Sequence, residues 1–308
     1  MRKFIFKRLI YGILVMWGVF SIVFILFAVL PVNSAIMTMG QRSDVSSEEA
    51  VKKDLGLDLP LGIRYVNFCN DFLPISFHNA SNPESVFYLH PDKYQAKPLF
   101  YFGKEQVCVV KTPYLGRSYQ SKRPVLEMLN EAFPKTALLA LLSIVFAIMV
   151  GMVIGILCAV FKDSWFDRLA IIFSVTGMAL PSFFAAILFA WIFAFLLADY
   201  TGLNMFGSLY TVSDFGDGEY LDLKNLILPA FTLGIRPLAT VVQLMRNSVL
   251  EVMSQNYVQT AFAKGLSFFN VVRKHVVKNA LNPVVTAISG WLAGMMAGAV
   301  YVEYIFDY

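Results

Sequence analysis

Long apolar stretches without charge dominate the chain. Three have no charged side chain and are long enough to cross a bilayer, at about 9–30, 136–161 and 169–198. Two weaker stretches cover 225–245, which includes one arginine, and 280–302, which is rich in small residues. This pattern predicts an all-α, polytopic membrane protein with five visible spans.

Small residues recur regularly in the fifth predicted span. Gly290, Gly294 and Gly298 stand at every fourth position and therefore share one narrow helix face. Such a face suits a tight interface or a pathway, and equally suits ordinary packing inside a helix bundle. The sequence leaves both interpretations open.

Basic residues indicate an orientation. The N-terminus carries four basic residues without an acid, and the short loop 246–279 carries five against one, whereas 199–224 is mainly acidic. Short loops rich in Lys and Arg stay in the cytoplasm. The sequence therefore predicts a cytoplasmic N-terminus, with 31–135 and 199–224 outside and 246–279 inside. The first span, at 22 residues, is longer than a signal-peptide apolar region and is expected to be retained.

Composition supports this class. The 308 residues are 57% hydrophobic and only 15% charged, which argues against a soluble protein. A formal net charge of +4 argues against a nucleic-acid-binding surface, and three cysteines are too few for a disulfide framework or a zinc site. Cys69 and Cys108 fall in the outer segment, where a disulfide and two free thiols are both allowed, while Cys158 is expected to pack within a span.

The outer segment 31–135 is too long for a simple connection and predicts structure of its own. We expect short helices over 47–55, from Pro60 onward, and over 124–132, with a β-hairpin formed by strands near 99–102 and 106–110. This segment suits either a docking or gating element facing a partner or a solvent-side cap of no special role.

The sequence of the segment 246–279, which we call the inner loop, predicts two amphipathic helices, over about 250–264 and 267–279. Gly265 breaks them, and Ser267 can cap the second. A basic amphipathic pair of this kind lies in the lipid interface or docks into a groove of a soluble partner. Composition alone does not choose between the two.

This loop resembles a known family. Tyr257–Ser267 and His275–Thr286 are similar to the cytoplasmic loop of ABC-importer permeases, in particular the dipeptide/oligopeptide/nickel permease family. That loop carries a Glu-Ala-Ala motif followed three residues later by Gly, and here Gln259-Thr260-Ala261 precedes Gly265, so the Glu is absent. Other segments match the family in the same order: Phe6–Ile10, Leu30–Pro31, Asp54–Pro60, Leu115–Ser118, Arg123–Leu126, Ser164–Arg168, Leu180–Ser182, Leu228–Ala230 and Val302–Phe306.

Two features depart from the family pattern. The segment 78–113 looks like an insertion, so outer contacts of the family do not carry over simply. The family also continues past the position of Tyr308 to a sixth span, which we expect beyond that residue.

The resemblance implies a type I ABC-importer transmembrane domain, a single permease domain over 1–308 in the inner (plasma) membrane. Its partners would be a second permease subunit (a copy or a homologue), two cytoplasmic ABC ATPases, an extracytoplasmic solute-binding protein and the lipid bilayer, but no nucleic acid. The chain has no G-x-x-x-x-G-K-[ST] phosphate loop, so ATP and Mg²⁺ would bind the ATPases. The chain itself is expected to be neither an enzyme nor a cofactor carrier, and its cargo to be peptides, nickel or other small solutes.

The resemblance also assigns candidate site residues. The loop around Gly265 would dock in a cleft of the ATPase, with Phe268 and Phe269 as buried anchors. Lys264, Arg273 and Lys274 would steer the two proteins together and pair with carboxylates. The expected coupling residues are Tyr257, Gln259, Thr260, Ala261, Lys264, Gly265, Leu266, Ser267, Phe268 and Phe269.

Residues within the predicted spans add further candidates. Arg236 is the only charge inside a predicted span, which suits a contact along the translocation path, or a side chain that reaches the interface or bonds freed carbonyls. Pro181, Pro229 and Pro283 suit either hinges or structural kinks.

Three other classes compete with this interpretation. A membrane-embedded enzyme lacks the usual motifs, and His78, His90 and His275 are predicted on opposite sides of the membrane, so no catalytic or metal site using all three is expected. An ion-coupled secondary transporter usually has intramembrane carboxylates and internal repeats, and this sequence shows neither. A passive membrane scaffold also stays open.

Overall fold

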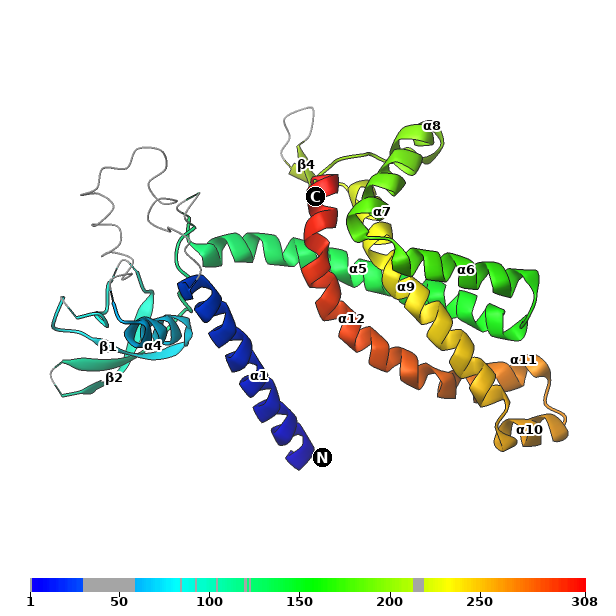
Figure 1. Cartoon of the computed structure of the whole chain (residues 1–308), viewed down its shortest axis with the longest axis horizontal. Coiled ribbons are helices and arrows are strands. Elements are labelled where there is room, and N and C mark those ends of the chain that lie inside the picture. The colour runs from blue at the N-terminus through cyan, green and yellow to red at the C-terminus, as the bar shows by residue number, and fades with distance from the viewer. Residues whose placement is uncertain are drawn as a thin grey trace. The chain divides into compact units, whose positions relative to one another are not determined.

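The computed structural model places the chain in two compact units, 1–131 and 132–308, which are described separately here (Figure 1). The described residues are 2–29, 59–83, 85–91, 93–103, 105–118, 121, 123–212 and 219–308. The helix expected over 47–55 lies outside them.

Two helices in the first unit pack through aromatic rings. Helix α1 (Arg2–Val29) contacts α4 (Leu61–Phe72), whose N-cap is Pro60 as expected. The ring centroids of Phe20 and Phe68 lie 4.3 Å apart, and those of Phe24 and Tyr65 lie 5.1 Å apart. The predicted aromatic face of α4 is therefore the face that packs on α1.

A three-stranded antiparallel sheet follows α4. Strands β1 (Ile75–Asn79), β2 (Ala96–Phe102) and β3 (Gln106–Lys111) lie in the order β1-β3-β2. The expected hairpin is confirmed as β2 and β3, although both strands are longer than predicted, and β1 was not foreseen. The thiols of Cys69 and Cys108 are both free and buried, so they do not form a disulfide.

Helix α5 (Val125–Val160) runs unbroken for 36 residues from the first unit into the second. The sequence predicted a short helix ending near residue 132 and a separate span from 136, and this separation is wrong. Pro134 lies inside the helix without ending it. As expected, Cys158 is a buried packing residue of this helix.

The predicted span 169–198 is bent at Pro181, where the sequence allowed a kink or a hinge. Helix α6 (Trp165–Ala179) and the pair formed by α7 (Ser182–Phe189) and a π-helical segment (Ala190–Leu196) meet at a bend of 114°. Leu180 is extended and Pro181 is the N-cap of α7. Proline lacks an N–H and disfavours helical backbone in the residue before it, so the helix ends here.

The second unit continues with α8 (Ala198–Thr201), the short strands β4 (Tyr210–Val212) and β5 (Glu219–Leu221), and α9 (Lys224–Met253). The inner loop contains α10 (Asn256–Ala263) and α11 (Phe268–Val271). A π-helical segment (Val272–Val276) joins α11 to α12 (Val277–Phe306).

Residues Phe268–Phe306 form one continuous helix of 39 residues. The sequence predicted an amphipathic helix over about 267–279 and a span over 280–302, and the structure joins the two into one helix. Within the ranges that the structure describes, four helices are long and apolar enough to cross a membrane, and the bent pair makes a fifth span if it is counted as one. The predominantly helical, multi-span membrane fold is confirmed, with two small sheets added to it.

Helices α5 and α9 approach closely at glycines. A Cβ on Gly155 would lie 2.8 Å from the carbonyl oxygen of Val242, and one on Gly234 would lie 2.9 Å from that of Ser143. The close approach therefore requires glycine at both positions. In contrast, nothing lies within 4 Å of a Cβ built on Gly290, Gly294 or Gly298.

Candidate functional site

The inner loop turns sharply at Gly265. Its φ is +81°, a left-handed conformation that residues with a side chain rarely adopt. The N–H of Gly265 donates to the carbonyl of Phe262 at 2.9 Å, and the N–H of Leu266 donates to that of Ala261 at 3.3 Å. These two bonds form a Schellman motif that ends α10. The predicted break at Gly265 is therefore confirmed, with backbone conformation as its cause.

The inner face of the loop is buried against the long helices. Val258 and Ala261 of α10 and Val271 of α11 pack in one cluster with Met245 of α9 and Val284 of α12. The loop is therefore fixed to both helices by apolar contact.

A hydrogen bond adds to this attachment. The side chain of Asn279 donates to the Tyr257 hydroxyl at 3.0 Å and to the backbone carbonyl of His275 at 2.8 Å. Tyr257 at the start of α10 is thereby tied to the first turn of α12.

The outer face of the loop is apolar and exposed. Phe268 is 47% exposed and Phe269 is 69% exposed, and Tyr257 and Leu266 of the same loop are exposed as well. The rings of Phe262 and Phe268 stack at 6.2 Å. We call Tyr257, Leu266, Phe268 and Phe269 the loop apolar surface.

The other expected coupling residues lie around this surface. Gln259 and Thr260 bond backbone carbonyls within the loop, at Met253 and Asn256 respectively. Lys264 is exposed. Ser267 is the N-cap residue of α11, but its side chain makes no capping hydrogen bond, so the expected cap is wrong in this respect.

A buried ion pair lies near the same end of α9. Arg246 Nε donates to Asp167 Oδ1 at 2.6 Å, and its second nitrogen donates to Oδ2 at 2.7 Å. The side chains are 16% and 2% exposed, respectively. The bidentate pair therefore ties α9 to α6 with fixed geometry.

The same carboxylate also organises the turn before α6. Asp167 Oδ2 accepts from the backbone N–H of Asp163, whose φ is +62°. Ser164 Oγ accepts from the backbone N–H of Asp167 and so caps α6. Sequence reasoning missed the ion pair because 79 residues separate its members, and the family match at Ser164–Arg168 does not indicate a partner for Asp167.

The remaining candidates inside the spans are dispersed. Arg236 is exposed on α9, next to the buried Pro237. Pro229 and Pro283 lie inside the continuous helices α9 and α12, whereas Pro181 stands at the 114° bend. The structure therefore does not bring Arg236 and the three prolines together into one site.

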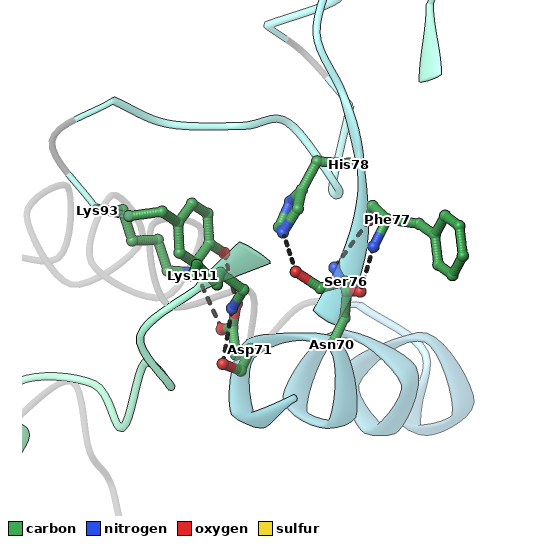
Figure 2. A network of polar contacts seen from close by, with 8 residues as sticks. Asn70, Asp71, Ser76, Phe77, His78, Lys93 and Lys111 are labelled. Atoms are coloured by element: carbon green, nitrogen blue, oxygen red, sulfur yellow. Dashed lines mark hydrogen bonds and ion pairs between the residues drawn. The ribbon is translucent and has the colours of Figure 1, made fainter. Parts of the chain in front are cut away.

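A second polar cluster lies in the first unit (Figure 2). The Asp71 carboxylate accepts from Lys93 Nζ at 3.0 Å and from the Tyr94 hydroxyl, and the Asp71 backbone carbonyl accepts from Lys111 Nζ at 2.7 Å. His78 Nε2 lies 3.0 Å from Ser76 Oγ. The cluster ties α4 to the sheet, because its members come from both.

Burial shifts the proton equilibria of this cluster. Burial, with a smaller effect from the Lys111 charge, lowers the pKa of His78 to about 4. Burial also lowers the pKa of Lys111 to about 8, although Asp71 opposes this shift. Among the described residues, no group of three or more His, Cys, Asp or Glu side chains is arranged to hold a metal ion.

Comparisons with known proteins match nearly the whole chain. The family model described as "Binding-protein-dependent transport system inner membrane component" matches residues 151–308, and its N-terminal counterpart matches residues 1–82. Residues 83–150 lie outside both matches, so the expected insertion at 78–113 stays a prediction.

Three relatives align with almost the whole of this chain and with most of their own length. A dipeptide transport system permease protein DppB from Alkalihalophilus pseudofirmus is 27% identical over 100% of this chain and 85% of its own length. A putative peptide transport system permease protein from Brucella abortus is 31% identical over 99% of this chain and 83% of its own. A glutathione transport system permease protein GsiC from Salmonella typhimurium is 29% identical over 100% and 83%. The chain therefore belongs to the family of inner-membrane components of binding-protein-dependent transport systems, as an ABC-importer permease of the dipeptide/oligopeptide group.

Proposed function

We propose that this permease forms part of the translocation pathway for peptides and takes its energy from two cytoplasmic ATPases through the loop between α9 and α12. One observation carries the proposal: the loop buries one face against α9 and α12 and exposes the loop apolar surface on the other. An exposed apolar patch on a fixed support suits a partner's groove. The chain has no phosphate loop of its own.

The packing indicates how a movement of the loop would be transmitted to the spanning helices. Val258 and Val271 hold the loop to α9 and α12, so the three would move together. The ion pair between Asp167 and Arg246 joins α9 to α6, and α6 leads to the bend at Pro181. Pro181 is therefore the candidate hinge that the structure supports best, because the helix is already interrupted there.

A second permease subunit, copy or homologue, would complete the pathway. Gly290, Gly294 and Gly298 leave open space for a helix to approach α12. Cysteine replacing Gly294 should cross-link to a permease subunit in membranes. Cysteine replacing Leu292, which lies on a different side of the same helix, should not.

An extracytoplasmic binding protein would deliver the cargo. Peptides are the cargo that the relatives' names favour, and nickel or other small solutes are the alternatives. Arg236 is a candidate contact for a cargo carboxylate because it is exposed on a spanning helix. Normal peptide uptake by the Arg236→Gln variant would contradict this assignment.

The loop is tested by Gly265→Val in vesicles that contain the assembled transporter. Valine at φ +81° should distort the turn and reduce ATP-driven peptide uptake at least tenfold, with membrane insertion intact. The matched control is Gly202→Val, which changes another glycine of positive φ, at +61°, with no neighbour within 4 Å. The Phe268→Ala/Phe269→Ala double variant tests the loop apolar surface with no change to the turn.

The outcomes separate the alternatives. Uptake lost in Gly265→Val and in the double alanine variant, but kept in Gly202→Val, supports coupling through the loop. Uptake that proceeds without ATP and follows an ion gradient would indicate a secondary transporter. No uptake with any partner added would favour a membrane scaffold.

A further inference from the structure

One face of the sheet formed by β1, β2 and β3, which we call the outer sheet, carries several exposed apolar side chains. The strand register places Ile75 opposite Val110, and Phe77 and Phe100 opposite Cys108, on the same face as Phe102. We call Ile75, Phe77, Phe100, Phe102 and Val110 the outer apolar face. Each is between 41% and 55% exposed. The Phe102 ring lies 6.2 Å from that of Phe77 and 4.9 Å from that of Phe100, so the aromatic rings form one continuous patch.

Helix α4 extends this patch. Ile63 and Val66 are 40% and 53% exposed on its surface. Val66 and Phe77 both line an open cavity of about 300 Å³. The apolar surfaces of the helix and the sheet therefore meet across this cavity.

The contacts of α4 with α1 indicate how deep α4 lies relative to the bilayer. The uncharged part of α1 begins at Leu9, and a rise of 1.5 Å per residue puts Phe20 roughly 17 Å and Phe24 roughly 22 Å farther along. A hydrocarbon core is about 30 Å thick. Phe20 and Phe24, the residues that contact Phe68 and Tyr65 of α4, thus lie in its far half. These ring contacts place α4 beside α1, as Figure 1 shows.

Backbone groups limit how deep the sheet can lie. The Asn70 side chain donates to the Phe77 carbonyl at 2.9 Å and accepts from the Phe77 N–H at 3.1 Å, which covers the edge of β1 (Figure 2). The opposite edge, on β2, has no strand partner among the described residues. Unpaired backbone groups are too costly in hydrocarbon but are satisfied among headgroups and water.

The charge on this face agrees with a lipid surface. Lys97 lies opposite Val110 and is exposed, and the paired residues on this face of the described strands include no acid. Aromatic residues with a nearby lysine favour the headgroup boundary, above all where anionic lipids are present.

We propose that the outer apolar face and the exposed residues of α4 lie in the headgroup boundary of the outer leaflet, beside α1. The outer unit thus rests on the membrane surface instead of standing free in the periplasmic or external space. The inference rests on the proposed function only for the orientation of the chain. Lipid is favoured as the occupant because the patch continues from α4, which packs on a membrane-spanning helix.

The test uses the assembled transporter in vesicles of phosphatidylethanolamine and phosphatidylglycerol. An environment-sensitive fluorophore is attached to cysteine in Phe100→Cys, and the matched control is Tyr101→Cys, the next residue of β2, which faces the other side of the sheet. Lipids brominated near the headgroup boundary should quench the label at position 100 at least threefold more strongly than at 101. Phe77→Cys serves as a second position, and the unsubstituted chain measures background from its buried cysteines.

Equal quenching at positions 100 and 101, or none at positions 100 and 77, would overturn the inference. A label at position 100 that stays in water until purified solute-binding protein is added would also overturn it, and would identify a protein-docking surface. Peptide uptake is measured in the same vesicles. Intact uptake without quenching refutes only this inference, whereas quenching without ATP-driven uptake refutes only the proposed function.

Discussion

At the residue scale, the Asp167–Arg246 pair is a buried, bidentate contact of the second unit. Asp167 is 2% exposed, and both of its carboxylate oxygens accept from Arg246. The carboxylate also accepts from the backbone N–H of Asp163. Arg246 supplies the largest compensation of this charge, and a buried charge that loses its partner is costly.

Loss of one partner should therefore destabilise the protein. We expect Arg246→Gln to lower the free energy of unfolding by about 2–3 kcal/mol, less than the roughly 3–5 kcal/mol of a fully buried pair, because Arg246 keeps some exposure. Thermal unfolding of the purified permease in mild detergent measures this. The Arg246→Gln/Asp167→Asn double variant should lose less than the sum of the two single variants.

The control for this prediction is Arg123→Gln. Arg123 also binds two carboxylates, those of Glu127 and Glu131, but all three side chains are about half exposed. Exposed pairs contribute little, so unfolding should hardly change. Equal losses for Arg123→Gln and Arg246→Gln would contradict the role assigned to burial.

His78 should make the outer sheet sensitive to acid. Its pKa is lowered from 6.5 to about 4, so the unfolded state binds the proton more readily than the folded state. The stability that depends on neutral His78 is complete above about pH 6.5 and is lost progressively as the pH falls towards 4. Hydrogen-exchange protection of β1 and β3, corrected for intrinsic rates, should fall over that interval.

Two variants check that His78 is the responsible group. His78→Asn removes the titrating group, so the loss of protection between pH 6.5 and 4 should flatten. His90→Asn, which changes an exposed histidine of the same unit, should keep the original profile. An unchanged profile in His78→Asn would assign the acid sensitivity to another group.

At the element scale, hydropathy located the membrane helices but not their breaks. The stretch 169–198 is uniformly apolar, yet the chain bends by 114° at Pro181. Helices α9 and α12 contain Pro229 and Pro283 and continue through them. The presence of a proline alone therefore does not determine whether a helix ends. Packing of the surrounding turns against other helices also affects whether the helix continues.

The close packing of α5 on α9 provides a prediction at this scale. In Gly155→Ala the new Cβ would lie 2.7 Å from Met245 Cβ and 2.8 Å from the Val242 carbonyl oxygen, so the helices must separate. We expect a loss of about 1–3 kcal/mol in thermal unfolding. Gly18→Ala, on α1 with nothing within 4 Å, should be neutral or slightly stabilising, because alanine favours helix.

At the scale of the whole molecule, the distribution of charge predicts the orientation. Basic residues concentrate at the N-terminus and in the loop after α9, and acidic residues concentrate around 199–224. The proposed coupling to cytoplasmic ATPases and the proposed lipid contact of the outer sheet both require this orientation.

Thiol labelling in right-side-out membrane vesicles tests the orientation. A membrane-impermeant maleimide should label Tyr101→Cys directly, because Tyr101 is 65% exposed in the outer unit. Ser254→Cys, in the exposed turn between α9 and α10, should be labelled only after the membrane is permeabilised. The reverse pattern would invert the topology and contradict the coupling proposal.

The sequence by itself determined the features that depend on neighbouring residues. Apolar runs located the membrane helices, a glycine located the turn at 265, and two short apolar runs on either side of Gly103 located the β2–β3 hairpin. Hydropathy, helical periodicity and backbone conformation are local properties, so a short window of sequence is enough to recognise them.

Only the tertiary structure decided which distant residues meet. It paired Asp167 with Arg246, set Asn70 on the edge of β1, placed α4 against α1 and showed that 268–306 is one helix. These contacts follow from the way helices and strands pack, which brings residues together regardless of their separation along the chain. The buried ion pair and the exposed outer apolar face are therefore properties of the packed molecule, because burial exists only once the elements are assembled.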